Sequence, residues 1–171
     1  MAFPEGVLTR TLLLGMGNPI LSDDAVGVRL ARDLGAALAG TPGLEVVPEC
    51  SAGGLALLEL LHGYDRVVVV DSIKTRGGRP GDWYRFTAAA LRETMNLRNV
   101  HDANFATALA LGRRLGHPLP ADEEIHVLAV EIEENREFSE SLSPALERAY
   151  AGVLAGMLDE LRSLVAPPPI R

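Results

Sequence analysis

Residues 12–30, LLLGMGNPILSDDAVGVRL, decide the predicted fold, because an apolar run passes through two glycines into a stretch with helical spacing. This is how a nucleotide-binding strand, turn and helix begin, yet Asp23 and Asp24 stand where phosphate would bind. Carboxylates compete with phosphate for a helix N-terminus, and a complete GxGxxG pattern would need glycine where Ile20 stands. The stretch therefore predicts an α/β protein and counts against a dinucleotide site.

A second stretch, RVVVVDSI at residues 66–73, indicates how the sheet is covered. Its four consecutive valines lack in/out alternation, as expected of a parallel strand that is buried on both faces. The neighbouring segments continue the alternation of elements, with strands predicted at 44–49, 81–88 and 123–133 and helices at 23–38, 53–63, 101–116 and 143–165.

We therefore predict a single α/β domain over residues 1–171, in three layers, with a mostly parallel twisted sheet and helices on both faces. Ser143 and Pro144 predict the N-cap and first position of the closing helix. The lead at 1–9 and the proline-rich tail at 166–171 are predicted to be peripheral.

Composition narrows the class of protein. The chain has 171 residues, 47% hydrophobic and 23% charged, which suits one globular domain with a sizeable core. A formal net charge of −7 disfavours binding to nucleic acid or to an anionic membrane, and no apolar run is long enough to span a bilayer. Cys50 is the only cysteine, so no internal disulfide can form and a reducing, cytoplasmic setting is expected.

Three places in the chain hold candidates for chemistry. In parallel sheets ligands bind outside the carboxyl ends of the strands, where Asp71 closes the valine strand and His101 precedes a later helix. Each has an ordinary alternative: Asp71 as a turn residue, His101 as a capping residue, and Asp23 and Asp24 as first-turn charges behind a Ser22 cap. Together, two carboxylates and one imidazole can hold a borderline divalent cation and leave coordination positions open.

The remaining reactive residues give less support for a site. His62, His117 and His126 are interpreted as structural or exposed. Cys50 and Ser51 end a strand without a GxSxG elbow, and HExxH is absent, so a hydrolase would depend on metal-assisted attack by water.

The first motif, GxGNxxxxD[DE]xxG, is matched by Gly15, Gly17, Asn18, Asp23, Asp24 and Gly27. With the SAGGLALLELL, VVVVDSIK and VHDANFATAL segments in order, the chain resembles the maturation endopeptidases of [NiFe] hydrogenases. The resemblance implies an aspartate-type, nickel-dependent endopeptidase that removes a short C-terminal extension from the nickel-loaded large-subunit precursor.

The resemblance also implies the site. The residues that are both catalytic and in contact with the metal fall on Asp24, Asp71 and His101, which we expect at an open loop edge. That family often has glutamate at the first position, so Asp23 could share the role of Asp24. No cofactor of its own is implied, because the precursor carries the nickel; whether nickel polarises the scissile carbonyl or positions the chain stays open. The expected partner is that precursor, and the expected state a monomer.

Two other functions share part of the pattern. LLLGMGNP also resembles the opening of peptidyl-tRNA hydrolases, but Ser22, Asp23 and Asp24 replace the Tyr/Thr-Arg-His-Asn stretch and the net charge is negative. A nucleotide-binding α/β module is the other alternative. The acidic segment 133–143, preceded by Glu131, is either a contact for a basic part of the partner or a solvated charged loop.

Overall fold

The computed structural model describes residues 8–93, 100–133 and 137–166, with only the backbone described at 91–93 and 100–104. Most of the predicted lead and tail falls outside these ranges. The strands form one five-stranded sheet in the order β2-β1-β3-β5-β4, parallel except for β4, which pairs antiparallel with β5. They are β1 (Thr11–Met16), β2 (Leu44–Cys50), β3 (Arg66–Ile73), β4 (Trp83–Thr87) and β5 (Ile125–Glu131).

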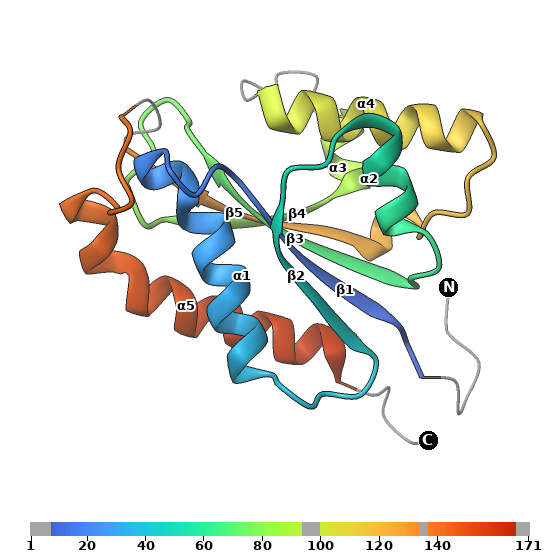
Figure 1. Cartoon of the computed structure of the whole chain (residues 1–171), viewed down its shortest axis with the longest axis horizontal. Helices are drawn as coiled ribbons and strands as arrows, with labels where there is room; N and C mark the ends of the chain where they lie inside the picture. Colours follow the sequence, from blue (N-terminus) through green and yellow to red (C-terminus); the bar gives the residue numbers. More distant parts are fainter. Residues whose placement is uncertain (1–7, 94–99, 134–136, 167–171) are drawn as a thin grey trace.

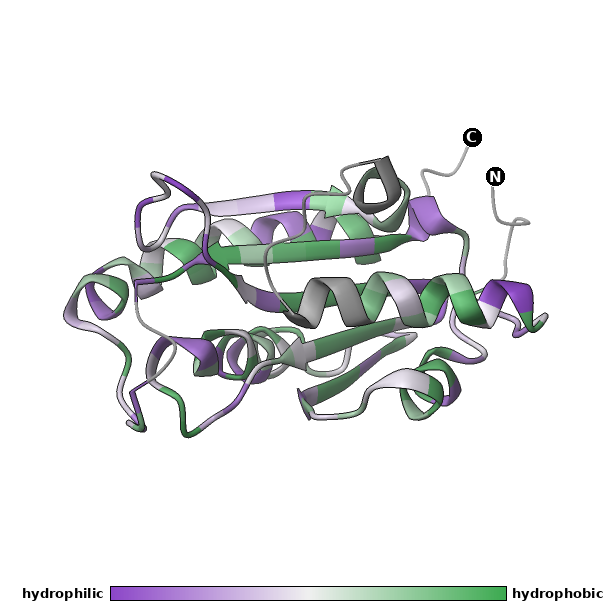
Figure 2. Ribbon diagram, turned by 90° about the horizontal axis from the view of Figure 1, so that it is seen from above, coloured by the Kyte–Doolittle hydropathy of each residue, from purple (hydrophilic) through white to green (hydrophobic). Residues whose placement is uncertain are grey.

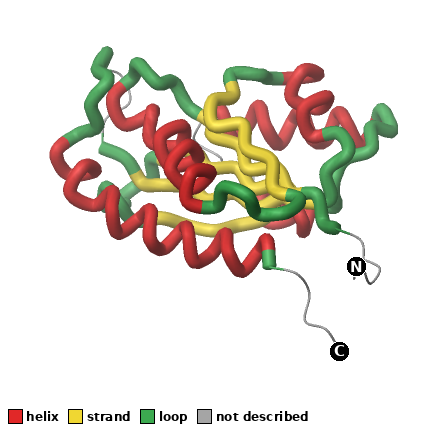
Figure 3. Tube along the Cα trace, turned by 60° about the horizontal axis from the view of Figure 1, so that its bottom comes forward, coloured by secondary structure: helices red, strands yellow, loops and turns green. Residues whose placement is uncertain are grey.

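Helices cover both faces of this sheet (Figures 1 and 3). One face carries α1 (Val26–Ala37) and α5 (Pro144–Val165), and the other carries α2 (Gly54–Leu61), α3 (Ala88–Glu93) and α4 (Val100–Arg114). Short 3₁₀ turns, η1 (Ser22–Ala25) and η2 (Asp122–Glu124), precede α1 and β5. Within the described ranges, no helix is both long enough and apolar enough to cross a membrane.

The central strand β3 separates two apolar cores, as its valines predict. Val68 and Val70 pack with α1 and α5, whereas Val67 and Val69 pack with α2 and α4. Adjacent residues of a strand point to opposite faces, so one strand serves both layers. The strands at the centre of the sheet are hydrophobic along most of their length (Figure 2). The predicted fold class is confirmed.

The structure differs from the predictions in two places. Most of α3 falls in the interval between the strand predicted at 81–88 and the helix predicted at 101–116, where no element was predicted, and the predicted helix at 23–38 begins with the η1 turn. The closing helix begins as predicted, with Pro144 first and Ser143 Oγ accepting a hydrogen bond from Leu146 N at 3.4 Å.

Gly27 lets α1 approach the sheet unusually closely. A Cβ at this position would lie 2.2 Å from Met16 O and 2.6 Å from Val70 O, so only glycine fits between α1 and the ends of β1 and β3. This contact brings the preceding η1 turn down onto the carboxyl ends of both strands. The position of Asp23 and Asp24 therefore depends on the absence of a side chain at Gly27.

Replacing Gly27 by alanine should lower the free energy of unfolding by about 1–3 kcal/mol, because the added methyl overpacks a backbone contact. Gly152→Ala is the matched control, since Gly152 lies in α5 and a Cβ there meets nothing within 4 Å. The control should gain about 0.5–1 kcal/mol from helix propensity. Urea unfolding measures both, and a Gly27→Ala protein as stable as the wild type would contradict this packing argument.

His126 in β5 is a buried side chain at the end of the strand remote from its carboxyl terminus. It is 5% exposed, and its Nδ1 has no hydrogen-bond partner among the described residues. Burial, followed by the charges of Arg85 and Arg66, lowers the pKa of His126 to about 4 from its usual 6.5. Of the two positions that the sequence left open for it, structural or exposed, the structure shows the first.

A lowered folded-state pKa means that the unfolded chain binds the His126 proton more readily. The free energy of unfolding should therefore fall as the pH drops from about 6.5 to about 4, by about 3 kcal/mol in total. His126→Leu should flatten the upper part of this window, between pH 6.5 and 5, where few carboxylates titrate. The exposed His62 supplies the control variant, His62→Gln, which should keep the wild-type slope. The same slope in both variants would count against His126 as its source.

Candidate functional site

Asp24 is held in the η1 turn by donors from two directions. Its Oδ2 accepts a hydrogen bond from Asn18 N at 2.8 Å, and its Oδ1 accepts one from Ser72 Oγ at 2.9 Å. The side chain is only 6% exposed. Because each carboxylate oxygen can accept more than one hydrogen bond, both oxygens keep a lone pair for a further partner.

Asp71 lies at the same edge of the sheet, near the carboxyl end of β3. It is 3% exposed, and its Oδ1 accepts a hydrogen bond from Ser72 N at 2.7 Å. Ser72 therefore binds both acids, through its hydroxyl to Asp24 and through its backbone to Asp71. Both aspartates thus have a bond to the same residue, and the approach of their side chains to one another stays a prediction. Both are buried, and the expectation of an open loop edge was wrong for them.

His101 belongs to the first turn of α4, the helix that packs on the sheet face shared with Val67 and Val69. By strand alternation Asp71 falls on that same face. The side chain of His101 lies outside the described residues, so its predicted place beside the aspartates stays a prediction. Among the side chains that are described, no group of three His, Cys, Asp or Glu residues gathers closely enough to hold a metal ion.

Asp23 has a different task from its neighbour. It is fully buried, its Oδ1 accepts a hydrogen bond from Ser143 N at 2.6 Å, and its Oδ2 accepts one from Glu133 N at 3.1 Å. Glu133 and Ser143 are the two ends of the 133–143 segment, so these hydrogen bonds from Asp23 hold both ends against η1. Asp23 is thus engaged by backbone amides, while Asp24 is the acid that contacts β3.

Ser22 does not cap the helix, so that part of the alternative interpretation was wrong, although Asp23 and Asp24 do lie in the first turn of η1. Leu21 precedes η1 without any side-chain cap, and Ser22 itself adopts a positive φ of 37°. Ser22 N donates to Ser139 O at 2.8 Å, and Ser22 Oγ donates to Ser141 O at 3.3 Å. The turn is shaped by the segment across from it rather than by its own helix.

Glu131 is a buried acid whose role the sequence did not reveal. It is 1% exposed, and its carboxylate accepts hydrogen bonds from Thr75 N at 2.6 Å and Thr75 Oγ1 at 2.8 Å. A Cβ on Gly78 would lie 2.4 Å from either carboxylate oxygen. Glu131 therefore fixes the loop after β3. One of the two interpretations had placed it near a basic part of the partner, but the buried Glu131 is not available for that contact.

A groove opens between the carboxyl ends of β1 and β2. It has a volume of about 450 Å³, and one of the residues that line it is Asn18, whose backbone binds Asp24. Cys50 contributes a free thiol that is 6% exposed. The groove is lined by Met16, Gly17, Asn18, Pro19, Ile20, Glu49, Cys50, Ser51 and Ala52.

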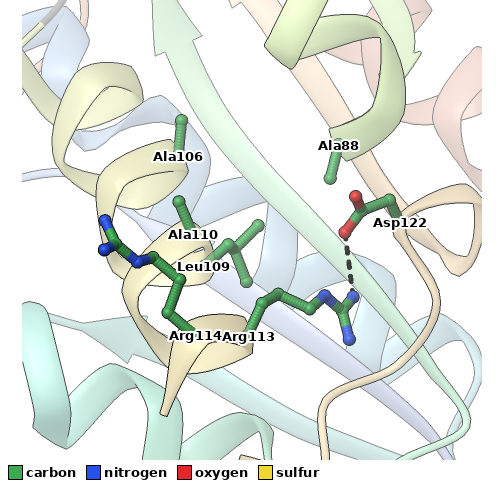
Figure 4. Close-up of a pocket in the computed structure, with 7 residues that line it drawn as sticks. All are labelled: Ala88, Ala106, Leu109, Ala110, Arg113, Arg114 and Asp122. Carbon is green, nitrogen blue, oxygen red and sulfur yellow. Dashed lines mark hydrogen bonds and ion pairs between the residues drawn. The ribbon is translucent and has the colours of Figure 1, made fainter. Parts of the chain in front are cut away.

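A second pocket, of about 330 Å³, lies between α3 and α4 (Figure 4). Its Arg113 is bound to Asp122 Oδ1 at 2.8 Å and to Leu119 O at 3.0 Å, which ties α4 to the segment before β5. Asp122 precedes β5, so this pocket lies toward the amino end of the parallel strands. Ligands of such sheets bind at the carboxyl end, and the groove beside Asp24 is the better candidate.

Asp23→Ala should lower the free energy of unfolding by about 1–3 kcal/mol, because it leaves two partly buried backbone amides, those of Glu133 and Ser143, without their acceptor. Asp159→Ala is the control: the Asp159 side chain is 80% exposed, and its loss should change stability by less than about 0.5 kcal/mol. Chemical unfolding compares the two variants. Equal stability of both would show that the bonds to Glu133 and Ser143 contribute nothing.

Comparisons with known proteins agree with this architecture. The chain is similar to the hydrogenase maturating endopeptidase HybD from Escherichia coli, with 26% identity and a TM-score of 0.71 over 91% of this chain and 93% of that one. Two proteins of Thermococcus kodakarensis share the fold. The maturation protease HybD has 22% identity and a TM-score of 0.69, over 90% of this chain and 99% of that one. The maturation protease HycI has 20% identity and a TM-score of 0.66, over 92% of each chain. No curated protein sequence matches.

A model of the hydrogenase maturation protease family matches residues 28–160. Asp71 and His101 lie inside the matched range, and Asp24 lies just before it. The match favours a protease over the peptidyl-tRNA hydrolase and nucleotide-binding alternatives. The acids at the edge of the sheet thus sit in a chain that belongs to the hydrogenase maturation protease family, whose members are hydrolases.

Proposed function

We propose that this protein is the endopeptidase that removes a short C-terminal extension from the nickel-loaded large-subunit precursor of a [NiFe] hydrogenase. The observation that carries the proposal is the pair of buried carboxylates, Asp24 and Asp71, joined through Ser72 at the carboxyl edge of the sheet in a chain of this family. His101 completes the proposed set as the third contact to the metal.

The chemistry of the pair supports a cation as its target. Burying a charged carboxylate is unfavourable, the more so when a second buried carboxylate lies at the same edge of the sheet, and a divalent cation offsets that cost. Oxygen ligands from Asp24 and Asp71 with an imidazole from His101 suit a borderline metal such as nickel. We propose that the nickel arrives with the precursor, as part of the substrate, rather than as a resident cofactor.

Recognition of the substrate's metal would make cleavage depend on nickel insertion. A precursor with and without nickel differs in affinity only if the protease contacts the ion itself or a change that the ion causes. Asp24 and Asp71 offer that direct contact, and the metal would then orient the chain or polarise its scissile carbonyl.

We place the precursor's chain in the groove that Asn18 lines. Its position next to Asp24 would let one substrate occupy the acids and the groove together. Two large apolar side chains stand exposed beside it: Ile20, which lines the groove and is 49% exposed, and Phe138, which is 79% exposed. The backbones of their segments are joined, since Ser139 N donates to Ile20 O at 3.1 Å. Exposed apolar side chains of this size suit contact with a protein substrate.

The purified protein should cut the nickel-loaded precursor and leave the nickel-free precursor intact, because only the loaded form presents the ion. Intact-mass measurement of the large subunit after incubation with each form shows whether the extension is lost. Nickel-loaded precursor without added protein is the control for spontaneous cleavage. Equal cleavage of the two forms would rule out recognition of the metal.

Asp24→Asn, Asp71→Asn and His101→Gln should each lower the rate of cleavage by about 100-fold or more, since each removes a proposed metal ligand. Asparagine keeps the volume of aspartate, so the buried positions stay filled. Asp159→Asn, on the exposed side of α5, removes the same charge and should cleave at the wild-type rate. Rates are compared by intact mass after circular dichroism has confirmed folding. A fully active His101→Gln variant would remove His101 from the site.

A further inference from the structure

Ser72 contacts both carboxylates of the proposed site, although neither its residue type nor its place in a strand marks it as functional. Its Oγ donates to Asp24 Oδ1 at 2.9 Å, and its backbone N donates to Asp71 Oδ1 at 2.7 Å. The residue is 5% exposed. Both acids are therefore anchored to one buried residue.

The alternation of side chains along β3 explains how one residue reaches both acids. Val68 and Val70 face the α1 layer, so the Ser72 side chain points toward that layer and meets the η1 turn that carries Asp24. Asp71, one residue earlier, is directed to the opposite face. An acid from each side of the sheet is thereby linked across the strand through a single residue.

The strand itself gives this link a rigid base. In the β3–β5 ladder Ser72 pairs with Val130, with Asp71 and Ile73 paired on either side of it. A hydroxyl fixed in such a ladder constrains the carboxylate that it binds, because the backbone beneath it cannot move independently. Sites on rigid elements hold their geometry better than sites on loops.

We infer that Ser72 is a positioning residue, which holds Asp24 in a fixed arrangement with Asp71 before the metal-bearing substrate arrives. The inference rests on the proposed function and deepens it. Ser72 touches neither metal nor substrate; it acts through Asp24. The bond from Ser72 Oγ uses one lone pair of Asp24 Oδ1 and leaves the other available, so support and metal contact are compatible.

Ser72→Ala tests the hydroxyl alone, because it keeps the backbone bond to Asp71 and removes only the bond to Asp24. Loss of such an outer partner of a metal ligand typically costs about 10–100-fold in metal affinity or activity, and we expect a loss of that size here. Ser72→Thr restores a hydroxyl at the same carbon and should recover activity to within about threefold of the wild type.

Ser143→Ala is the matched control for stability. The substitution removes the serine hydroxyl that caps α5 and should lower the free energy of unfolding by about 1 kcal/mol. The Ser143 hydroxyl makes no hydrogen bond to Asp24 or Asp71. Cleavage by this variant should match the wild type. Thermal unfolding of all the variants separates loss of fold from loss of position; if Ser72→Thr does not fold, the comparison of Ser72→Ala with Ser143→Ala still decides.

Two readouts are needed. One is the rate of cleavage at saturating nickel-loaded precursor, together with KM; the other is the affinity of the protein alone for Ni²⁺, measured by calorimetry. Ser72→Ala should weaken Ni²⁺ binding by about 10–100-fold, while Ser143→Ala leaves it unchanged. Wild-type cleavage and wild-type Ni²⁺ affinity in Ser72→Ala would overturn the inference. Failure of the proposed function would be distinct, because the wild-type protein itself would then leave the nickel-loaded precursor uncut.

Discussion

The contact of Gly27 with the backbone of β1 and β3 is the constraint on which the rest of the site depends. Because nothing separates α1 from Met16 O and Val70 O, the η1 turn is held at the carboxyl ends of both strands. Only at that distance can Asp24 accept the hydrogen bond from Ser72 Oγ. The second glycine of the motif belongs to the same arrangement, since a Cβ on Gly17 would lie 2.0 Å from Asp24 O. The glycines of the nucleotide-like motif therefore make room for an acid rather than for phosphate.

The consecutive aspartates Asp23 and Asp24 have different roles at this edge of the sheet. Asp23 is satisfied by backbone amides of the 133–143 segment and stabilises the fold, while Asp24 keeps lone pairs for a partner. A buried carboxylate needs hydrogen-bond donors in place of the water that it has lost, and each of these acids obtains them from a different part of the chain. In our proposal this separation lets the site stay preformed without a metal, since the bonds to Asn18 and Ser72 already fix Asp24.

Much of the fold was predictable because its signals are local. Four valines predicted β3 and a sheet covered on both faces, and Ser143 with Pro144 predicted the start of α5. The placement of Asp24 and Asp71 at one edge of the sheet followed from a general property of parallel strands, whose carboxyl ends share an edge. The role of Asp23 was not predictable, because its partners lie 110 and 120 residues away. Ser72 and Glu131 were missed for the same reason: each acts through a residue distant in the sequence, and no local pattern records such a bond.

The central claim is that Asp24, Asp71 and His101 contact the nickel of the precursor directly. Its most direct test is a crystal structure of the protein in complex with the nickel-loaded precursor, with anomalous diffraction collected at the nickel edge. We expect one anomalous peak within bonding distance of both carboxylates and of the His101 imidazole. A nickel ion bound only by residues of the precursor, with the two aspartates still bonded only to protein donors, would contradict it.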